Sequence, residues 1–259
     1  TRLAAIFDTG WMGGQAAGIL AGTDRTGVLL SPDLGTIARS NAQVIIDFSS
    51  ANAFTQVCAA ARAANLPLVS GTTGVDDEAM ASVFELARAV PVLWEPNMSV
   101  GIHVMALALE QTMRLLGDDF DCEIVEVHHK FKADAPSGTA KKLLEVASTQ
   151  QRQARSASLA PRSSNVVHGR EGRPGARLQG ELGMHAVRGG DVIGDHTVHL
   201  LGIGERLELT HRATSRDLFA KGALRAARFL KGRSAGRYTM RDVIQESAND
   251  TGAPLESVP

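Results

Sequence analysis

The sequence predicts a two-part α/β protein, with a doubly wound N-terminal domain followed by a second, α+β domain built on an open mixed sheet. Two observations support this fold class. Strand-like and helix-like segments alternate over the first hundred residues, which is typical of a parallel sheet with helices on both faces. After about Ser99 the composition shifts, and three strand-like segments follow one another without helices between them.

The elements of the first domain follow from short apolar runs and helical periodicity. The expected strands are Leu3–Phe7, Gly27–Leu30, Val44–Phe48, Pro67–Ser70 and Val92–Trp94. The expected helices are Met12–Ala21, Leu34–Arg39, Ala53–Ala64 and Glu78–Ala89. Polar or small residues follow three of the strands, at Asp47–Ser50, Gly71–Gly74 and Glu95–Met98. Because ligands of such sheets bind at the carboxyl ends of the strands, these segments predict a nucleotide crevice.

The second domain begins with a long apolar helix and a strand that ends at two adjacent histidines. The expected elements are the helix Gly101–Leu116, the strand Cys122–Val127, the helix Lys141–Thr149, the strands Glu181–Val187, Asp191–Leu201 and Glu205–Thr210, and the helices Phe219–Leu230 and Met240–Ile244. Residues from about Ser247 onward are expected to be frayed. The arginine-rich segment Gln150–Arg177 has almost no apolar period and predicts a mobile basic loop.

Composition excludes several classes of function. The net charge of −1 gives no overall attraction to nucleic acid or membrane, although the basic loop alone could bind nucleic acid. Aromatic residues make up only 4% of the chain, which disfavours a base-stacking surface. No apolar run approaches a membrane span, and the N-terminus has no signal-peptide pattern. Cys58 and Cys122 are expected to be buried free thiols, and the histidines lack metal-ligand spacing, so no metal is expected.

The segment from Glu123 to Ala140, EIVEVHHKFKADAPSGTA, combines acid/base side chains with a turn that leads into a helix. The first N–H groups of a helix have no internal partner and carry partial positive charge, so they can bind a carboxylate or phosphate. The side chains of His128 and Lys132 could supply a proton or positive charge beside such a group. The same residues could instead form an ordinary turn with a helix cap.

This segment resembles the signature of the 4-hydroxy-tetrahydrodipicolinate reductase (dihydrodipicolinate reductase) family, E-I-x-E-x-H-H-x-x-K-x-D-x-P-S-G-T-A, at every specified position. Further resemblances follow in the same order along the chain, at GTTG, PNMSVGIHVM, RGGDVIGDHTV, GERLELTHRATSR and YTMRDVI. The resemblance implies a Rossmann-like dinucleotide-binding domain, residues 1–98 with 216–259, and a substrate-binding and oligomerisation domain, residues 99–215. It also implies a homotetramer that uses NADH or NADPH to reduce a cyclic dicarboxylate in the diaminopimelate route to lysine, and the composition fits a cytoplasmic enzyme.

The site residues are inferred from this resemblance. His128 and Lys132 match the catalytic pair. The substrate-binding positions are matched by His129, Ser137, Gly138, Thr139 and, with a less direct correspondence, Arg216. The positions that line the cofactor are matched by Gly10, Trp11, Met12, Gly71, Thr72, Thr73, Glu95, Pro96, Asn97 and Met98.

The chain departs from the family in the first cofactor loop. The family pattern G-x-x-G-R-M-G is replaced by FDTGWMG, so Phe7 stands at a glycine position and Trp11 at the arginine position. Only 33 residues separate Gly13 from Asp47, which leaves Asp33 as a candidate ribose ligand or simply as a helix cap. The choice between NADH and NADPH stays open. The alternative function is a paralogue that binds a dicarboxylate but transfers hydride weakly or not at all.

Overall fold

A computed structural model describes residues 6–7, 30–156 and 165–250 of the chain. The chain divides into two compact units, Thr1–Met98 with Ala220–Pro259, and Ser99–Phe219. The expected helix Met12–Ala21 and the cofactor-loop residues Gly10, Trp11 and Met12 lie outside the described residues.

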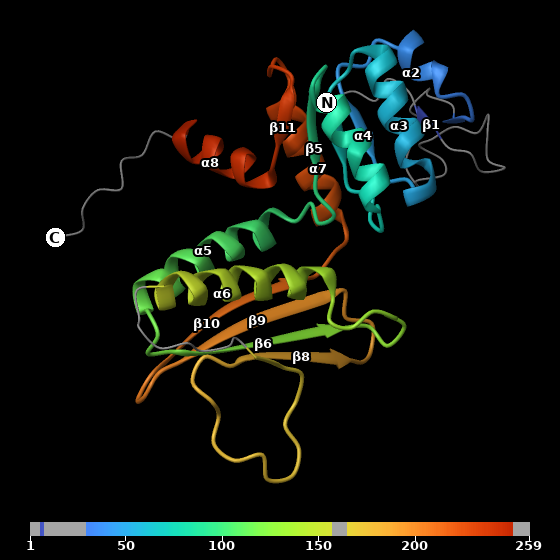
Figure 1. The fold of residues 1–259 in the computed structure, drawn as a ribbon. Coiled ribbons are helices and arrows are strands. Elements are labelled where there is room, and N and C mark those ends of the chain that lie inside the picture. The colour runs from blue at the N-terminus through green and yellow to red at the C-terminus, as the bar shows by residue number, and fades with distance from the viewer. Residues whose placement is uncertain (1–5, 8–29, 157–164, 251–259) are drawn as a thin grey trace. The chain divides into compact units, whose positions relative to one another are not determined.

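The first unit contains a four-stranded parallel sheet in the order β11-β5-β4-β3 (Figure 1). Its strands are β3 (Ile45–Asp47), β4 (Leu68–Ser70), β5 (Pro91–Trp94) and β11 (Gly236–Tyr238), and its helices include α2 (Gly35–Arg39), α3 (Ala51–Ala64), α4 (Asp77–Ala87) and α8 (Met240–Asp250). A separate parallel pair joins β1 (Ile6–Phe7) to β2 (Leu30–Ser31). The alternation of strand and helix confirms the predicted α/β fold of this part.

The core of the first unit lies between the sheet and helices α3 and α4. Phe54, Val57 and Ala61 face it from α3, and Val83 and Leu86 face it from α4. Helix α3 ends at Asn65, whose backbone adopts the left-handed conformation (φ 51°) that terminates many helices. Cys58 is buried among these side chains, which confirms the predicted buried free thiol, and burial raises its pKa to about 11.

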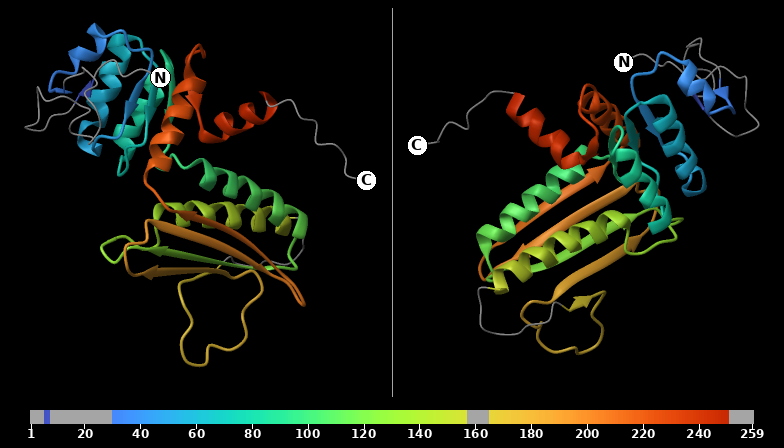
Figure 2. Two further views of the ribbon diagram at one scale, coloured as in Figure 1. Left: turned by 180° about the vertical axis from the view of Figure 1, so that it is seen from behind. Right: turned by 45° about the horizontal axis from the view of Figure 1, so that its top comes forward.

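The second unit is a five-stranded mixed sheet in the order β10-β9-β6-β8-β7, with two long helices on one face (Figures 1 and 2). The strands are β6 (Asp121–His128), β7 (Val166–Val167), β8 (Leu182–Arg188), β9 (Gly194–Leu201) and β10 (Arg206–Ala213), and the covering helices are α5 (Val100–Leu116) and α6 (Gly138–Ser156). Strand β6 pairs parallel with β8 and antiparallel with β9, as a mixed sheet requires. Helix α7 (Asp217–Leu230) leads back to the first unit.

Side chains of β6 alternate between the two faces of this sheet. Cys122, Ile124, Glu126 and His128 are buried on the face that α5 and α6 cover, while the residues between them are partly exposed. Burial raises the pKa of the Cys122 thiol to about 12. The alternation therefore directs the first histidine of the pair, and a glutamate two residues before it, towards the helices.

Two expectations for the second half of the chain were wrong. Residues 150–177 do not form one loop, because α6 continues to Ser156 and residues 166–167 form β7. Helix α6 extends because Gln150 and Gln151 continue its buried face after Leu143 and Ala147, at helical spacing. The final helix was also expected to end at Ile244, but α8 continues to Asp250.

Candidate active site at the end of strand β6

The carboxyl end of β6 brings an acid/base pair into contact with the start of helix α6. The His128 Nδ1 atom lies 2.5 Å from Oε2 of Glu126, and the Ser137 N–H donates to Oε1 of the same carboxylate (3.0 Å). Glu126 is fully buried and His128 is 8% exposed. Sequence reasoning did not select Glu126, although a glutamate at a buried position of an alternating strand is a recognisable signal.

Arg188, at the end of the neighbouring strand β8, completes this cluster. Its guanidinium donates one hydrogen bond to each oxygen of Glu126, both at 2.8 Å, and a third to the Asp134 carbonyl oxygen (2.7 Å). Burial alone would raise the pKa of Glu126, but the hydrogen bonds from Arg188, His128 and the Ser137 N–H together lower it. The carboxylate is therefore ionised at neutral pH.

His196, on β9, is a further residue that sequence reasoning missed. Its ring meets that of His128 edge to face, with centroids 5.2 Å apart, and its Nε2 lies 3.2 Å from Oγ of Ser137. Burial, followed by repulsion from His128, lowers the pKa of His196 to about 4. A neutral imidazole therefore lies between the acid/base pair and the helix cap.

The predicted substrate-binding turn begins a helix. The Ser137 Oγ accepts from the Ala140 N–H (3.2 Å), as an N-cap side chain does. Gly138 is exposed and Thr139 is half-buried, so the start of α6 is accessible. The structure thus brings Ser137, Gly138 and Thr139 next to the Glu126–His128 pair.

Lys132 and His129 lie on the loop between β6 and α6. The Lys132 ammonium donates to Oδ1 of Asp134 (2.7 Å), and this hydrogen bond lowers the pKa of that carboxyl. His129 is fixed by its backbone N–H, which donates to the carbonyl oxygen of Val192 (2.7 Å), while its buried Nδ1 has no hydrogen-bond partner in the described structure. An unpartnered buried nitrogen suits a residue that binds a polar ligand.

Arg216 lies immediately before α7, and its side chain is exposed. Among the described contacts, no hydrogen bond or ion pair joins it to His128 or to the α6 turn. The structure therefore brings together the residues of β6 and α6 that were predicted to bind the substrate, but not this arginine.

In the first unit, a buried carboxylate organises the strand ends predicted to line the cofactor. Asp47 accepts from the hydroxyls of Ser70 (2.6 Å) and Thr72 (2.7 Å), and the Thr72 carbonyl oxygen accepts from the Trp94 indole (3.0 Å). A Cβ added at Gly71 would lie 2.3 Å from the ring of the half-exposed Phe48, so a side chain there would displace that ring. This network fixes the backbone of Gly71 and Thr72 at the carboxyl edge of the sheet.

The remaining cofactor-lining positions differ in accessibility. Thr73 and Pro96 are exposed, Glu95 and Asn97 are half-buried, and Met98 is 1% exposed. The edge fits a dinucleotide in this part, because parallel strands end together beside glycine and small polar residues. Asp33 pairs with Arg39 and accepts from the Gly35 N–H (2.8 Å), and these contacts lower its pKa. It lies just before α2, whose N-cap residue is Leu34.

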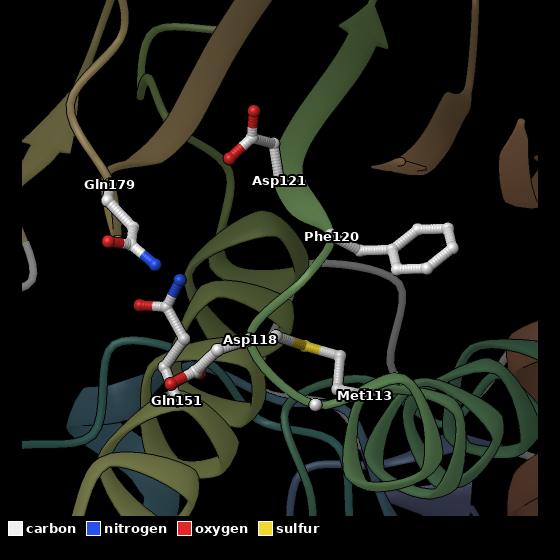
Figure 3. Close-up of a pocket in the computed structure, with 8 residues that line it drawn as sticks. Met113, Asp118, Phe120, Asp121, Gln151 and Gln179 are labelled. Atoms are coloured by element: carbon white, nitrogen blue, oxygen red, sulfur yellow. The ribbon is translucent and has the colours of Figure 1, made fainter. Parts of the chain in front are cut away.

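A small cavity lies at the opposite end of β6, between Met113, Phe120, Gln151 and Gln179 (Figure 3). Its volume is about 10 Å³, enough for one water molecule. Seven residues of strand separate Asp121, at its rim, from His128, which corresponds to about 23 Å. The cavity is therefore distinct from the acid/base cluster and too small for a substrate.

A parallel-stranded nucleotide-type domain joined to a mixed-sheet domain with a buried carboxylate–histidine pair defines a pyridine-nucleotide-dependent oxidoreductase. The chain belongs to the dihydrodipicolinate reductase family, whose N-terminal model matches residues 1–98 and whose C-terminal model matches residues 101–244.

Relatives support this assignment over most of the chain. A protein of Anaeromyxobacter dehalogenans, named 4-hydroxy-tetrahydrodipicolinate reductase, is 48% identical over 89% of this chain and 83% of its own length. A protein of the same name from Geobacter sulfurreducens is 43% identical over 90% and 85%. A dipicolinate-bound dihydrodipicolinate reductase from Paenisporosarcina sp. TG-14 has the same fold, with a TM-score of 0.67 at 24% identity over 92% of this chain and 87% of that one.

The face of the second sheet that α5 and α6 leave uncovered has a separate ionic cluster around Glu123. Its carboxylate accepts from Arg170 (2.9 and 3.1 Å), Arg177 (3.0 Å) and His185 (2.7 Å). These contacts anchor the segment between β7 and β8, which projects from that side of the sheet as an exposed loop (Figure 2). This part of the expected basic loop is therefore tied to the sheet through Arg170 and Arg177.

This cluster predicts an acid-sensitive contribution to stability. Burial would raise the pKa of Glu123, but hydrogen bonds from Arg170, His185 and Arg177 lower it to about 2, below the usual 4.5 of a glutamate. A lowered folded-state pKa stabilises the fold above pH 4.5, and the contribution disappears as the pH falls from 4.5 to 2. It is on the order of 3 kcal/mol. Urea unfolding at several pH values should show that the free energy of unfolding falls less on acidification in Glu123→Gln than in the wild-type protein. An identical fall in both proteins would contradict this prediction.

Proposed function

We propose that the protein reduces 4-hydroxy-tetrahydrodipicolinate to tetrahydrodipicolinate with NADH or NADPH, in the diaminopimelate route of lysine biosynthesis. The observation that carries the proposal is the contact between the Glu126–His128 pair and the first turn of α6. It joins a proton donor to an anion-binding helix N-terminus, and relatives at 43% and 48% identity are named for this reaction.

In this proposal the start of α6 binds a carboxylate of the substrate. Gly138 is exposed and Thr139 is half-buried there, their N–H groups are the candidate donors, and the helix dipole adds partial positive charge. His129 and Lys132 supply further hydrogen-bond donors on the adjoining loop, and Arg216 supplies a second cation for a dianionic substrate.

His128 and Lys132 perform the proton chemistry. His128 donates from Nε2, because its Nδ1 is engaged by Glu126. Lys132, aligned by Asp134, stabilises negative charge on the reacting ring and is the second candidate donor. When bound, NADH or NADPH supplies the hydride. Gly71–Thr73 and Glu95–Met98 would hold the dinucleotide, together with Gly10, Trp11 and Met12 of the first loop.

Calorimetric titration of the purified protein with NADH and, separately, with NADPH tests the cofactor part of this proposal. Micromolar binding of either nucleotide supports a reductase and identifies the preferred cofactor. Binding of neither at millimolar concentration would favour a paralogue that binds a dicarboxylate without reducing it. An assay of substrate-dependent nucleotide oxidation then distinguishes binding from turnover.

The unusual first loop gives a separate prediction. Phe7 is the last residue of β1 and stands at a glycine position of the family pattern. If its side chain restricts the approach of the backbone to the pyrophosphate, Phe7→Gly should tighten cofactor binding about tenfold. Calorimetry on both proteins measures this change. Equal affinities would mean that the loop accommodates the phenylalanine and that the restriction does not exist.

We also propose that the protein is a cytoplasmic homotetramer. The described residues contain no helix long and apolar enough to cross a membrane. Val187 and Leu201 are exposed on the face of the second sheet that the helices leave uncovered, and association of copies would bury them. Sedimentation should give four chains of 27.4 kDa, and a monomeric mass would contradict this assembly.

A further inference from the structure

The carboxylate of Glu126 has all its contacts within the active-site cluster. Each oxygen accepts two hydrogen bonds, one from Arg188 and one from another group. Oε2 accepts from His128 Nδ1 (2.5 Å) and Oε1 accepts from the Ser137 N–H (3.0 Å). The side chain is fully buried, so water cannot replace a lost partner.

The contact between Oε2 of Glu126 and Nδ1 fixes the tautomer of His128. An ionised carboxylate only accepts hydrogen bonds, so Nδ1 must carry hydrogen and the exchangeable proton of an imidazolium is on Nε2. A Cβ added at Gly194 would lie 2.9 Å from this Nε2. Glycine at this position therefore spares Nε2, the nitrogen that would donate the proton, from contact with a side chain.

The contact between Oε1 of Glu126 and the Ser137 N–H fixes the turn proposed to bind the substrate. Oε1 holds the N–H of Ser137, the residue that caps α6, and Arg188 reaches from the same carboxylate to the Asp134 carbonyl oxygen. The loop from His128 to the start of α6 is thus held near both ends by contacts that depend on one side chain. A shift of the carboxylate would move the proton donor and the anion-binding turn together.

We infer that Glu126 is a positioning residue for the reaction, which sets the tautomer and charge of His128 and aligns it with the helix N-terminus that binds the substrate. This inference rests on the proposed function, since it needs a proton donor and an anionic substrate. Glu126 holds the proton donor by its Nδ1 but does not itself reach the substrate, because it lies behind His128 and the α6 turn in the buried interior.

A purely structural role is the alternative, and the chain contains a matched example of one. Glu123 lies three residues earlier on the same strand and also binds arginines and a histidine, but on the opposite face of the sheet. Substitution of either glutamate disrupts a carboxylate–arginine cluster in which the carboxylate accepts a similar number of hydrogen bonds. Only the Glu126 cluster includes the proton donor, so the two substitutions separate positioning from stability.

The main experiment compares kcat between pH 5 and pH 10 for the wild-type protein, Glu126→Gln and Glu123→Gln. In Glu126→Gln we expect kcat to fall on the order of 100-fold, because the amide cannot stabilise the imidazolium. We also expect the alkaline limb of the plot of kcat against pH to move to lower pH by about one unit, since His128 loses its anionic partner. Glu123→Gln should keep the wild-type profile, and a Glu126→Gln profile identical to wild type would overturn the inference.

Arg188→Gln should shift the dependence of kcat on pH in the opposite direction to Glu126→Gln. The described titratable and charged groups that face this cluster are Glu126 on the strand of His128, Arg188 on β8, the neutral His196 on β9, and Lys132 and Asp134 on the following loop. Removal of the arginine leaves the carboxylate with fewer donors and a stronger attraction to the imidazolium. The alkaline limb should therefore move to higher pH, and a shift in the same direction as Glu126→Gln would indicate general disruption and refute the inference.

The tautomer of His128 can also be measured directly in the wild-type protein. Nitrogen-15 NMR of the histidine rings should show neutral His128 with hydrogen on Nδ1, the less common tautomer of free histidine. Hydrogen on Nε2 alone would contradict the inference even if Glu126→Gln failed to fold. Failure of the proposed function is distinguishable, because the wild-type protein would then not oxidise NADH or NADPH with the substrate while the tautomer could still be as expected.

Discussion

Replacement of His128 by glutamine should lower kcat on the order of 10²- to 10⁴-fold while the KM for the dicarboxylate changes little. Glutamine is close in size and can still hydrogen-bond to Glu126, so the buried position stays filled. It cannot carry the proton that His128 presents at Nε2. The loss should therefore fall on the chemical step, which steady-state oxidation of NADH or NADPH would measure.

A second histidine on the same sheet provides the control for this prediction. His199, on β9, pairs with Glu208 at 3.2 Å and points to the face opposite the helices. His199→Gln should leave kcat close to the wild-type value. If His128→Gln retained full turnover, the proton would have to come from another group, and Lys132 would be the next to test. A rise in KM without a fall in kcat would instead make His128 a binding residue.

The order and type of most elements could be predicted from local patterns. Strand β6 was expected at Cys122–Val127 and spans Asp121–His128, because alternation of apolar and polar residues is a strong local signal. Strand β11 was not predicted. It has only three residues, and it exists because Gly236–Tyr238 pairs with β5, about 145 residues earlier in the chain. No local pattern carries that information.

Only part of the site was predicted, because a local pattern does not show contacts between distant segments. The signature segment identified His128 and the Ser137 turn, which are close in sequence and therefore close in space. Arg188 and His196 contact them from other strands, and these contacts depend on the register that sets β8 and β9 beside β6. Glu126 was within the signature, yet its importance follows from burial, which its position in phase with Cys122 and Ile124 indicates.

Replacement of Gly222 by alanine should destabilise the first unit, although the same change in most helices is favourable by about 1 kcal/mol. Gly222 is buried in α7, and an added Cβ would lie 1.8 Å from the carbonyl oxygen of Met98. The clash is with backbone, which cannot rotate away as a side chain can, and Met98 is itself 1% exposed. We expect a net loss of about 2–4 kcal/mol in the free energy of unfolding, measured by urea denaturation.

The Gly222→Ala effect should extend to cofactor binding, because Met98 ends the Glu95–Met98 stretch proposed to line the nucleotide. If α7 moves to relieve the clash, the backbone of that stretch moves with it, and affinity for NADH or NADPH should fall. Gly189→Ala is the control for stability, since an added Cβ there meets no atom within 4 Å and its backbone is not left-handed. It should change stability by less than about 0.5 kcal/mol. Equal unfolding midpoints for Gly222→Ala and the wild-type protein would mean that α7 does not pack tightly on the Met98 backbone.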